Sequence, residues 1–190
     1  MLQEIEEEIR QCRKCPLWKT RTNAVPGEGR SDASLMLVGE APGRKEDVEG
    51  RPFVGAAGKL LTETLKKNGV GREEIYITNV VKCRPPGNRN PREEEIEKCL
   101  PYLQRQIDVV RPIIILAMGN FASSALLKMH GFRDGKITAI RGRIFESPLH
   151  AIKIIPTFHP AACIYNRALT EYFEKDVRKA LEHAGIIKPF

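Results

Sequence analysis

The chain has 190 residues, 42% of them hydrophobic and 29% charged, which is typical of one folded globular domain and excludes a disordered chain. No apolar run approaches the roughly 18 to 20 residues of a membrane-spanning helix, and the acidic start MLQEIEEEIRQ is unlike a secretory signal, so we expect a cytoplasmic protein that binds no membrane. The formal net charge of +7 favours a polyanionic partner such as nucleic acid, although many basic proteins bind none.

Apolar periodicity predicts helices and strands that alternate along the chain. Helices are expected over residues 1–11, 58–68, 90–110, 119–129 and 170–184. Strands are expected over residues 35–39, 75–81, 112–118 and 151–157. Between them, residues 12–33 are expected to form a loop, and residues 137–147 a hairpin or an irregular insert.

Two of the predicted helices carry additional signals. Asn90, Pro91 and Glu93 are the residue types that cap a helix, occupy its first position and complete a capping box. The last helix is expected to bury one face made of Tyr172, Phe173, Val177 and Leu181.

Strands that alternate with helices predict an α/β fold, in which helices cover both faces of a parallel sheet, as a single domain of residues 1–190. Ligands of such sheets bind beyond the carboxyl ends of the strands. Unusual residues stand at those ends: Gly39 after the first strand, Asn79 in the second and His159 after the fourth. We therefore expect the functional site along that edge of the sheet.

Neither common nucleotide motif fits the glycines near the first strand. A P-loop that ends at Gly58-Lys59 needs a glycine where Phe53 stands and a serine or threonine where Leu60 stands. A dinucleotide fingerprint needs three closely spaced glycines directly after the strand, and this spacing is not met by Gly39, Gly43 and Gly50.

The cysteines form a candidate ligand set. Cys12 and Cys15 make a C-x-x-C pair, and Cys83 and Cys99 follow far along the chain. Four thiolates suit either a tetrahedral zinc ion or an iron–sulfur cluster, and the wide spread favours the larger, four-iron group over two tight zinc knuckles. Cys163 is expected to be a small buried hydrophobe.

Three stretches resemble family 4 uracil-DNA glycosylases: GEAPGRKEDVEGRPFVG at 39–55, TNVVKCRPPGNRNP at 78–91 and FHPA at 158–161. The resemblance implies a three-layer α/β/α fold around a central four-stranded parallel sheet. It also implies one [4Fe-4S] cluster on Cys12, Cys15, Cys83 and Cys99. The implied activity is that of a monofunctional glycosylase that removes uracil from single- or double-stranded DNA and leaves an abasic site, the first step of base excision repair. We also expect a monomer, and the content of Glu, Lys and Arg fits a protein from a thermophile.

The resemblance gives roles to three residues, and each role has a plain structural alternative. The resemblance implies that the ring of Phe53 stacks on the base; the alternative is that Phe53 is an ordinary core phenylalanine. Asn79 can pair with uracil O4 and N3–H because a carboxamide both donates and accepts; otherwise it is a buried Asn bonded to backbone. His159 can donate a hydrogen bond to the negative charge that builds on uracil O2, and otherwise is a structural histidine.

Hydrolysis needs a water molecule that attacks the sugar, and this chain lacks the carboxylate that usually orients this water. Other uracil glycosylase families place an aspartate at the position of Ala41, where family 4 has a small residue. Glu40 or Glu46 can replace it, and the sequence does not divide the role between them; the resemblance adds that Glu46 crowds out the thymine methyl. Backbone N–H groups of Gly39, Ala41 and Gly43 are expected to bond the base.

The basic residues near these motifs are candidates for contacts with DNA phosphates. They are Arg84, Arg89, Arg92, Arg141 and Arg143. The stretch Cys163–Arg167 departs from the family pattern, so the side chain that fills the vacated base stack is left open. Two other functions remain: a non-catalytic iron–sulfur or zinc module that binds nucleic acid, and a glycosylase with another base preference.

Overall fold

A computed structural model describes residues 1–189. Six strands in these residues form one sheet in the order β1-β3-β2-β4-β6-β5. They are β1 Glu28–Gly29, β2 Leu35–Gly39, β3 Tyr76–Asn79, β4 Ile114–Met118, β5 Phe145–Glu146 and β6 Lys153–Thr157.

The four central strands, β3, β2, β4 and β6, pair in parallel, as predicted. The two outer strands, β1 and β5, pair antiparallel with β3 and β6. The prediction placed a loop where β1 lies and a hairpin or an irregular insert where β5 lies. Each outer strand has only two residues, which is too short to show an alternating apolar pattern.

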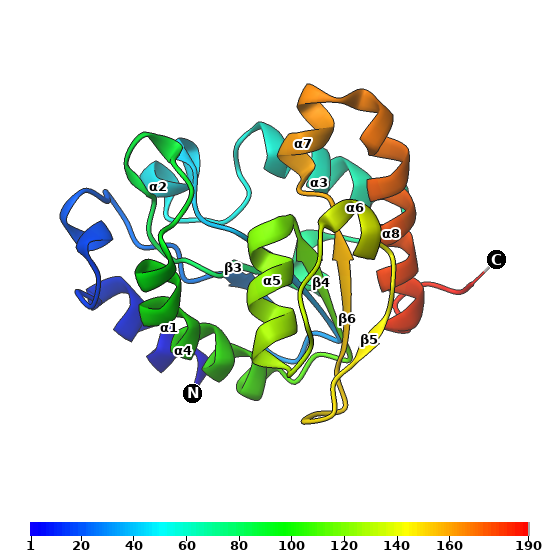
Figure 1. The fold of residues 1–190 in the computed structure, drawn as a ribbon, viewed down its shortest axis with the longest axis horizontal. Coiled ribbons are helices and arrows are strands. Elements are labelled where there is room, and N and C mark those ends of the chain that lie inside the picture. Colours follow the sequence, from blue (N-terminus) through cyan, green and yellow to red (C-terminus); the bar gives the residue numbers. More distant parts are fainter. Residues whose placement is uncertain (190) are drawn as a thin grey trace.

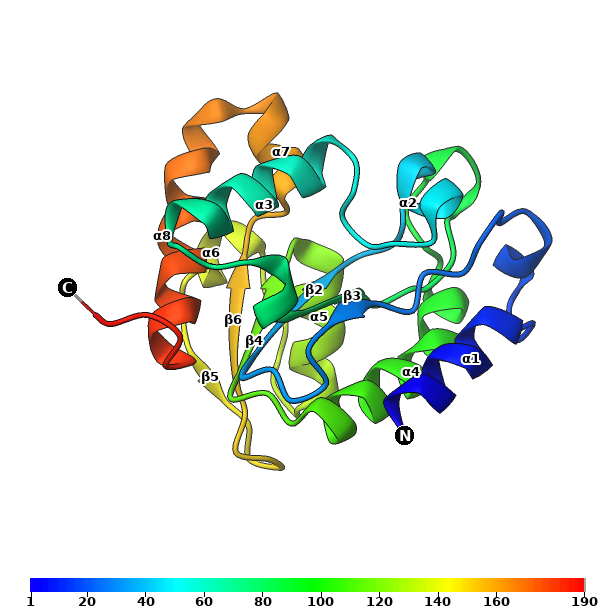
Figure 2. The same cartoon turned by 180° about the vertical axis from the view of Figure 1, so that it is seen from behind.

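Helices cover both faces of the sheet, which confirms the three-layer α/β/α arrangement. The helices are α1 Leu2–Gln11, α2 Arg44–Glu49, α3 Ala56–Lys67, α4 Glu93–Val110, α5 Asn120–Met129, α6 Ile137–Ile140, α7 Pro160–Tyr165 and α8 Thr170–His183. Figure 1 shows α5 in front of the sheet, and the opposite view in Figure 2 shows α3 in front of it. Helix α8 packs against α3 and against β4 and β6. No helix among residues 1–189 is long and apolar enough to cross a membrane.

Short 3₁₀ turns complete the connections. They are η1 Pro16–Lys19, η2 Arg72–Glu74, η3 Pro86–Asn88 and η4 Arg167–Leu169. The first lies in the segment that was predicted as a loop. The third lies between β3 and α4, so the chain turns sharply just beyond the sheet.

Two local predictions were wrong. Helix α4 begins at Glu93, not at Asn90, because Arg92 occupies the capping position and its amide N–H donates to the Glu95 carboxylate at 2.8 Å. Tyr172 is 48% exposed on α8. Asp176 is buried on this helix instead, where it bonds the Thr157 hydroxyl and the Arg141 guanidinium.

The sheet edge is where the register brings distant segments together. Gly39, the last residue of β2, pairs with Asn79, the last residue of β3. On the other side, Met118 of β4 pairs with Thr157 of β6, two residues before His159. Because parallel strands end at the same edge, the polar residues beyond them face one region.

Candidate active site

A cleft of about 550 Å³, open to solvent, lies beyond the carboxyl ends of the parallel strands. Predicted site residues from four separate segments line it. They are Glu40, Ala41, Gly43, Glu46, Phe53, Asn79, Arg89 and His159. The structure therefore brings together residues that lie far apart along the chain, from Glu40 to His159.

Phe53 places its ring between Gly39 and His159. The side chain is 6% exposed, and its ring centroid lies 5.8 Å from that of His159, with 30° between the planes. A Cβ on Gly39 would lie 2.4 Å from Phe53 Cζ. Strand β2 thus ends in glycine because the aromatic ring packs directly on its backbone.

Asn79 offers an unused hydrogen-bond acceptor. The residue is 2% exposed, and its Oδ1 has no hydrogen-bond partner in the described chain. A Cβ on Gly39 would lie 2.4 Å from this oxygen, so the amide also lies against the end of β2. An unsatisfied buried acceptor costs free energy, which an N–H donor of a ligand in the cleft would recover.

His159 is held as a neutral hydrogen-bond donor. The backbone N–H of Ala161 donates to His159 Nδ1 at 3.1 Å, in the first turn of α7. Because Nδ1 accepts, the ring proton of the neutral imidazole lies on Nε2. Burial lowers the pKa of His159 to about 4, so the ring stays uncharged near neutral pH.

The two glutamates of the cleft have different surroundings. Glu46 Oε1 accepts the N–H groups of Val54 and Gly55, at 2.9 and 2.8 Å. The Glu40 carboxylate makes no hydrogen bond or ion pair within residues 1–189, and burial raises its pKa. The Glu46 carboxylate therefore holds the turn that carries Phe53, whereas the Glu40 carboxylate is available to a ligand or a water molecule.

Two of the five predicted arginines form ion pairs with buried carboxylates. Arg89 donates to both oxygens of Glu95, at 2.9 and 2.6 Å, and Arg141 donates to both oxygens of Asp176. Such pairs fix the guanidinium groups in the fold. Arg89 still lines the cleft, while Arg141 does not.

The other three arginines lie outside the lining of the cleft. Arg84 donates to Asn88 Oδ1 at 2.7 Å, and the guanidinium of Arg143 lies 5.5 Å from the centroid of the Phe145 ring. The side chain of Arg92 is exposed. Their contacts with phosphates stay a prediction.

Three residues of the rim were missed by the sequence reasoning. Arg44 and Lys45, at the start of α2, bring positive charge to the cleft. Tyr165, the last residue of α7, also lines it and is 92% exposed. Both helices have only six residues, and no periodicity signal identifies a helix that short.

The four predicted ligand cysteines line a second, small cavity. Cys12 and Cys15 flank the connection between α1 and η1, while Cys83 follows β3 and Cys99 lies in α4. In residues 1–189, no three His, Cys, Asp or Glu side chains are grouped to hold a single metal ion. Cys163 lies apart in α7 and is 2% exposed, in agreement with a hydrophobic role.

Hydrogen-bond donors already point at two of these sulfurs. Arg21 Nη1 lies 3.0 Å from Cys83 Sγ, and the backbone N–H of Lys82 lies 3.3 Å from Cys99 Sγ. Donors of this kind stabilise the anionic sulfurs of a thiolate-bound cluster. The four sulfurs therefore lie where the N-terminal segment meets the segment that follows β3, and thiolates are ligands that suit a zinc ion or an iron–sulfur cluster.

Lys82 connects this cavity to the cleft. Its Nζ is fully buried and donates to the Thr78 hydroxyl, the Asn79 carbonyl and the Gln106 side chain, each at 2.6 Å. The same residue supplies the backbone donor to Cys99. The last residue of β3 is therefore fixed by the segment that carries the cysteines.

Comparison with known proteins gives consistent matches over nearly the whole chain. A sequence model described as the Uracil DNA glycosylase superfamily matches residues 26–183. The chain is 50% identical over 181 residues to the type-4 uracil-DNA glycosylase of Saccharolobus solfataricus, covering 94% of this chain and 84% of that protein. The protein of the same name from Archaeoglobus fulgidus is 47% identical over 190 residues, 99% of this chain and 96% of its own. That from Thermotoga maritima is 45% identical over 185 residues, with 95% and 93% covered.

Proposed function

The chain belongs to the uracil DNA glycosylase superfamily and, within it, to the type-4 uracil-DNA glycosylases, and we propose that its cleft receives a uracil flipped out of DNA. The enzyme hydrolyses the bond between the base and the deoxyribose, which releases uracil and leaves an abasic site for base excision repair. The observation that carries the proposal is the buried, unpartnered Oδ1 of Asn79 beside the Phe53 ring.

The flipped base lies on Phe53 and is identified by Asn79. Extrusion costs a few kcal/mol of stacking and pairing, which contact with the ring offsets. Asn79 Oδ1 accepts the N3–H of uracil, and Nδ2 donates to O4. Cytosine presents an acceptor at N3 and a donor at N4, so the same amide orientation is mismatched at both positions.

His159 stabilises the leaving base. As the glycosidic bond breaks, negative charge grows on uracil O2, and the Nε2–H of a neutral imidazole donates to it. One such donor is worth about 3 to 4 kcal/mol of transition-state stabilisation. The bond from the Ala161 N–H to Nδ1 supports this role, because it orients the ring before the substrate arrives.

Glu40 orients the water that attacks the sugar, and Glu46 acts through the loop. The Glu40 carboxylate lines the cleft without a protein partner, next to the small Ala41. Glu46 binds two N–H groups of the turn after Phe53. This division assigns the water to Glu40 and leaves Glu46 to shape the pocket.

Duplex or single-stranded DNA approaches over the rim of the cleft, with the enzyme acting as a monomer. Arg44 and Lys45 are placed to meet the phosphates near the flipped nucleotide, together with the predicted Arg84 and Arg92. Tyr165 is large, apolar over most of its surface and 92% exposed. We assign to this ring the space that the base vacates in the stack.

The cysteine cavity holds one [4Fe-4S] cluster, with Cys12, Cys15, Cys83 and Cys99 as ligands. The four thiols around one cavity, and the donors from Arg21 and Lys82, support this. When bound, the cluster supplies a covalent cross-link between the N-terminal segment and the segment after β3. Iron and zinc analysis of the purified protein, with its visible absorption, separates the cluster from a zinc site; one zinc per chain and no iron would refute it.

The test is excision from DNA with one uracil, in a U·G pair, a U·A pair or a single strand. Strand breakage after alkali, but not before it, is expected from a monofunctional enzyme, and a matched C·G duplex should stay intact. His159→Ala should slow single-turnover excision by about two orders of magnitude. No excision by the cluster-loaded wild-type protein would refute the proposed function.

A further inference from the structure

The residue that carries the stacking ring has a strained backbone. Phe53 has a φ of 51°, in the left-handed region that bulky residues rarely adopt. A conformation of this kind persists only where the surrounding structure holds it. The position of the ring, and with it the base, therefore depends on what fixes this turn.

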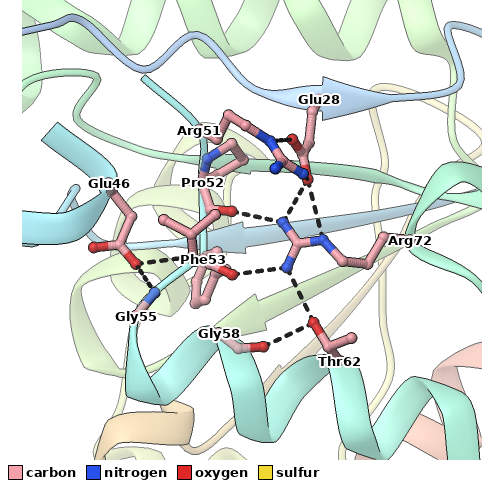
Figure 3. A network of polar contacts seen from close by, with 10 residues as sticks. Glu28, Glu46, Arg51, Pro52, Phe53, Gly55, Gly58, Thr62 and Arg72 are labelled. Carbon is pink, nitrogen blue, oxygen red and sulfur yellow. Dashed lines mark hydrogen bonds and ion pairs between the residues drawn. The ribbon is translucent and has the colours of Figure 1, made fainter. Parts of the chain in front are cut away.

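The guanidinium of Arg72 fixes the turn from the side away from the cleft (Figure 3). Its Nη2 donates to the Pro52 carbonyl at 2.6 Å and its Nη1 to the Phe53 carbonyl at 2.7 Å. The other N–H groups bond Thr62 Oγ1 at 3.2 Å and the Glu28 carboxylate at 2.5 and 3.0 Å. All five donors of the guanidinium are thus used.

Two neighbours complete the hold on the turn. Glu46 binds the N–H groups of Val54 and Gly55, and Figure 3 shows it on the opposite side of the turn from Arg72. Helix α3 comes so close that a Cβ on Gly58 would lie 1.8 Å from the Phe53 carbonyl oxygen. Carbonyls and N–H groups of the turn are therefore held by two different charged residues.

We propose that Arg72 is a positioning residue for uracil recognition, which holds the left-handed turn so that the Phe53 ring lies ready to stack on the base. Arg72 does not line the cleft, so it acts on the base only through Phe53. The inference rests on the proposed function, since it concerns how the same pocket binds uracil.

Lysine cannot replace this arginine fully. Its ammonium is a point charge with three donors, whereas the planar guanidinium reaches two carbonyls, a hydroxyl and a carboxylate together. Arg72→Lys is therefore expected to give an intermediate defect, and Arg72→Gln a larger one.

The experiment is a double-mutant cycle on single-turnover excision from a U·G duplex, with Arg72→Gln, Phe53→Ala and the pair combined. Arg72→Gln should slow excision roughly 10- to 100-fold, as misplaced binding groups do. The double variant should be no slower than Phe53→Ala, within about twofold, because the arginine has nothing left to position. If Arg72→Gln does not fold, Arg72→Lys takes its place in the same double-mutant cycle.

Arg51→Gln is the matched control. Arg51 also donates to Glu28, at 2.8 and 3.3 Å, but the side chain is 58% exposed and makes no bond to the Phe53 turn. We expect its excision rate to stay within about twofold of wild type. A folded Arg72→Gln protein with wild-type rates, or defects that multiply in the double variant, overturns the inference. An inactive wild type instead contradicts the proposed function.

Discussion

At the scale of single residues, the role proposed for Asn79 is to decide which base is cleaved. Replacing it with aspartate removes the donor that faces uracil O4 and puts a second acceptor there. We expect Asn79→Asp to slow uracil excision roughly tenfold or more, and to narrow the difference in rate between uracil and cytosine. Single-turnover rates on matched U·G and C·G duplexes measure both effects, and an unchanged ratio would mean that another group identifies the base.

His159 makes stability depend on pH. Its folded pKa of about 4 lies below the ordinary value of 6.5, so the unfolded chain takes up the proton first as pH falls. The contribution to stability is therefore complete above pH 6.5 and is lost as pH falls towards about 4. Urea unfolding across this pH range should show that the free energy of unfolding falls more steeply with decreasing pH for wild type than for His159→Asn. Parallel curves would contradict a buried, neutral imidazole.

Sequence reasoning found the residues whose position along the chain is itself informative. Asn79 interrupts an apolar strand, His159 follows one, and Phe53 is the one aromatic residue in a stretch rich in glycine and proline. The different surroundings of Glu40 and Glu46 could not be predicted, since they depend on which carboxylate meets the backbone N–H groups of a distant turn. Arg72 was not predicted for the same reason: its four partner residues come from three segments that only the fold brings together.

At the scale of elements, helix α7 holds two residues with proposed roles. Its cap is His159 and its last residue is Tyr165, so the proposed donor to the base and the proposed stack-filling ring are both positioned by one six-residue helix. Tyr165→Ala should slow excision from a U·A duplex several-fold, because the gap in the stack is no longer filled. Single-stranded DNA has no such gap, and its rate should change little; equal losses on both substrates would argue against the assignment.

The longer elements were predicted and the short ones were not. The central strands and helices α1, α3, α4, α5 and α8 show clear apolar patterns over at least four residues. Helices α2 and α7 and strands β1 and β5 are too short for such patterns, and they form because neighbouring elements hold them. The rim of the cleft is built from α2 and α7, so it was the least predictable part of the site.

At the scale of the whole molecule, the proposed cluster should contribute to stability. Its removal would free the N-terminal segment, with Cys12 and Cys15, from the segment after β3. We expect the melting temperature to fall by roughly 10 °C or more. Scanning calorimetry of the cluster-loaded and chelator-treated protein measures this, with a Cys163→Ala variant as control, because Cys163 is outside the cavity.

The order of strands in the sheet has a consequence for synthesis. Strand β6 lies between β4 and β5 although it is the last strand in the chain, and His159 follows it directly. A growing chain therefore displays Phe53 and Asn79 long before it can supply the imidazole. With the role proposed for His159, an unfinished chain cannot break the glycosidic bond efficiently, and full activity requires that the last strand has been inserted into the sheet.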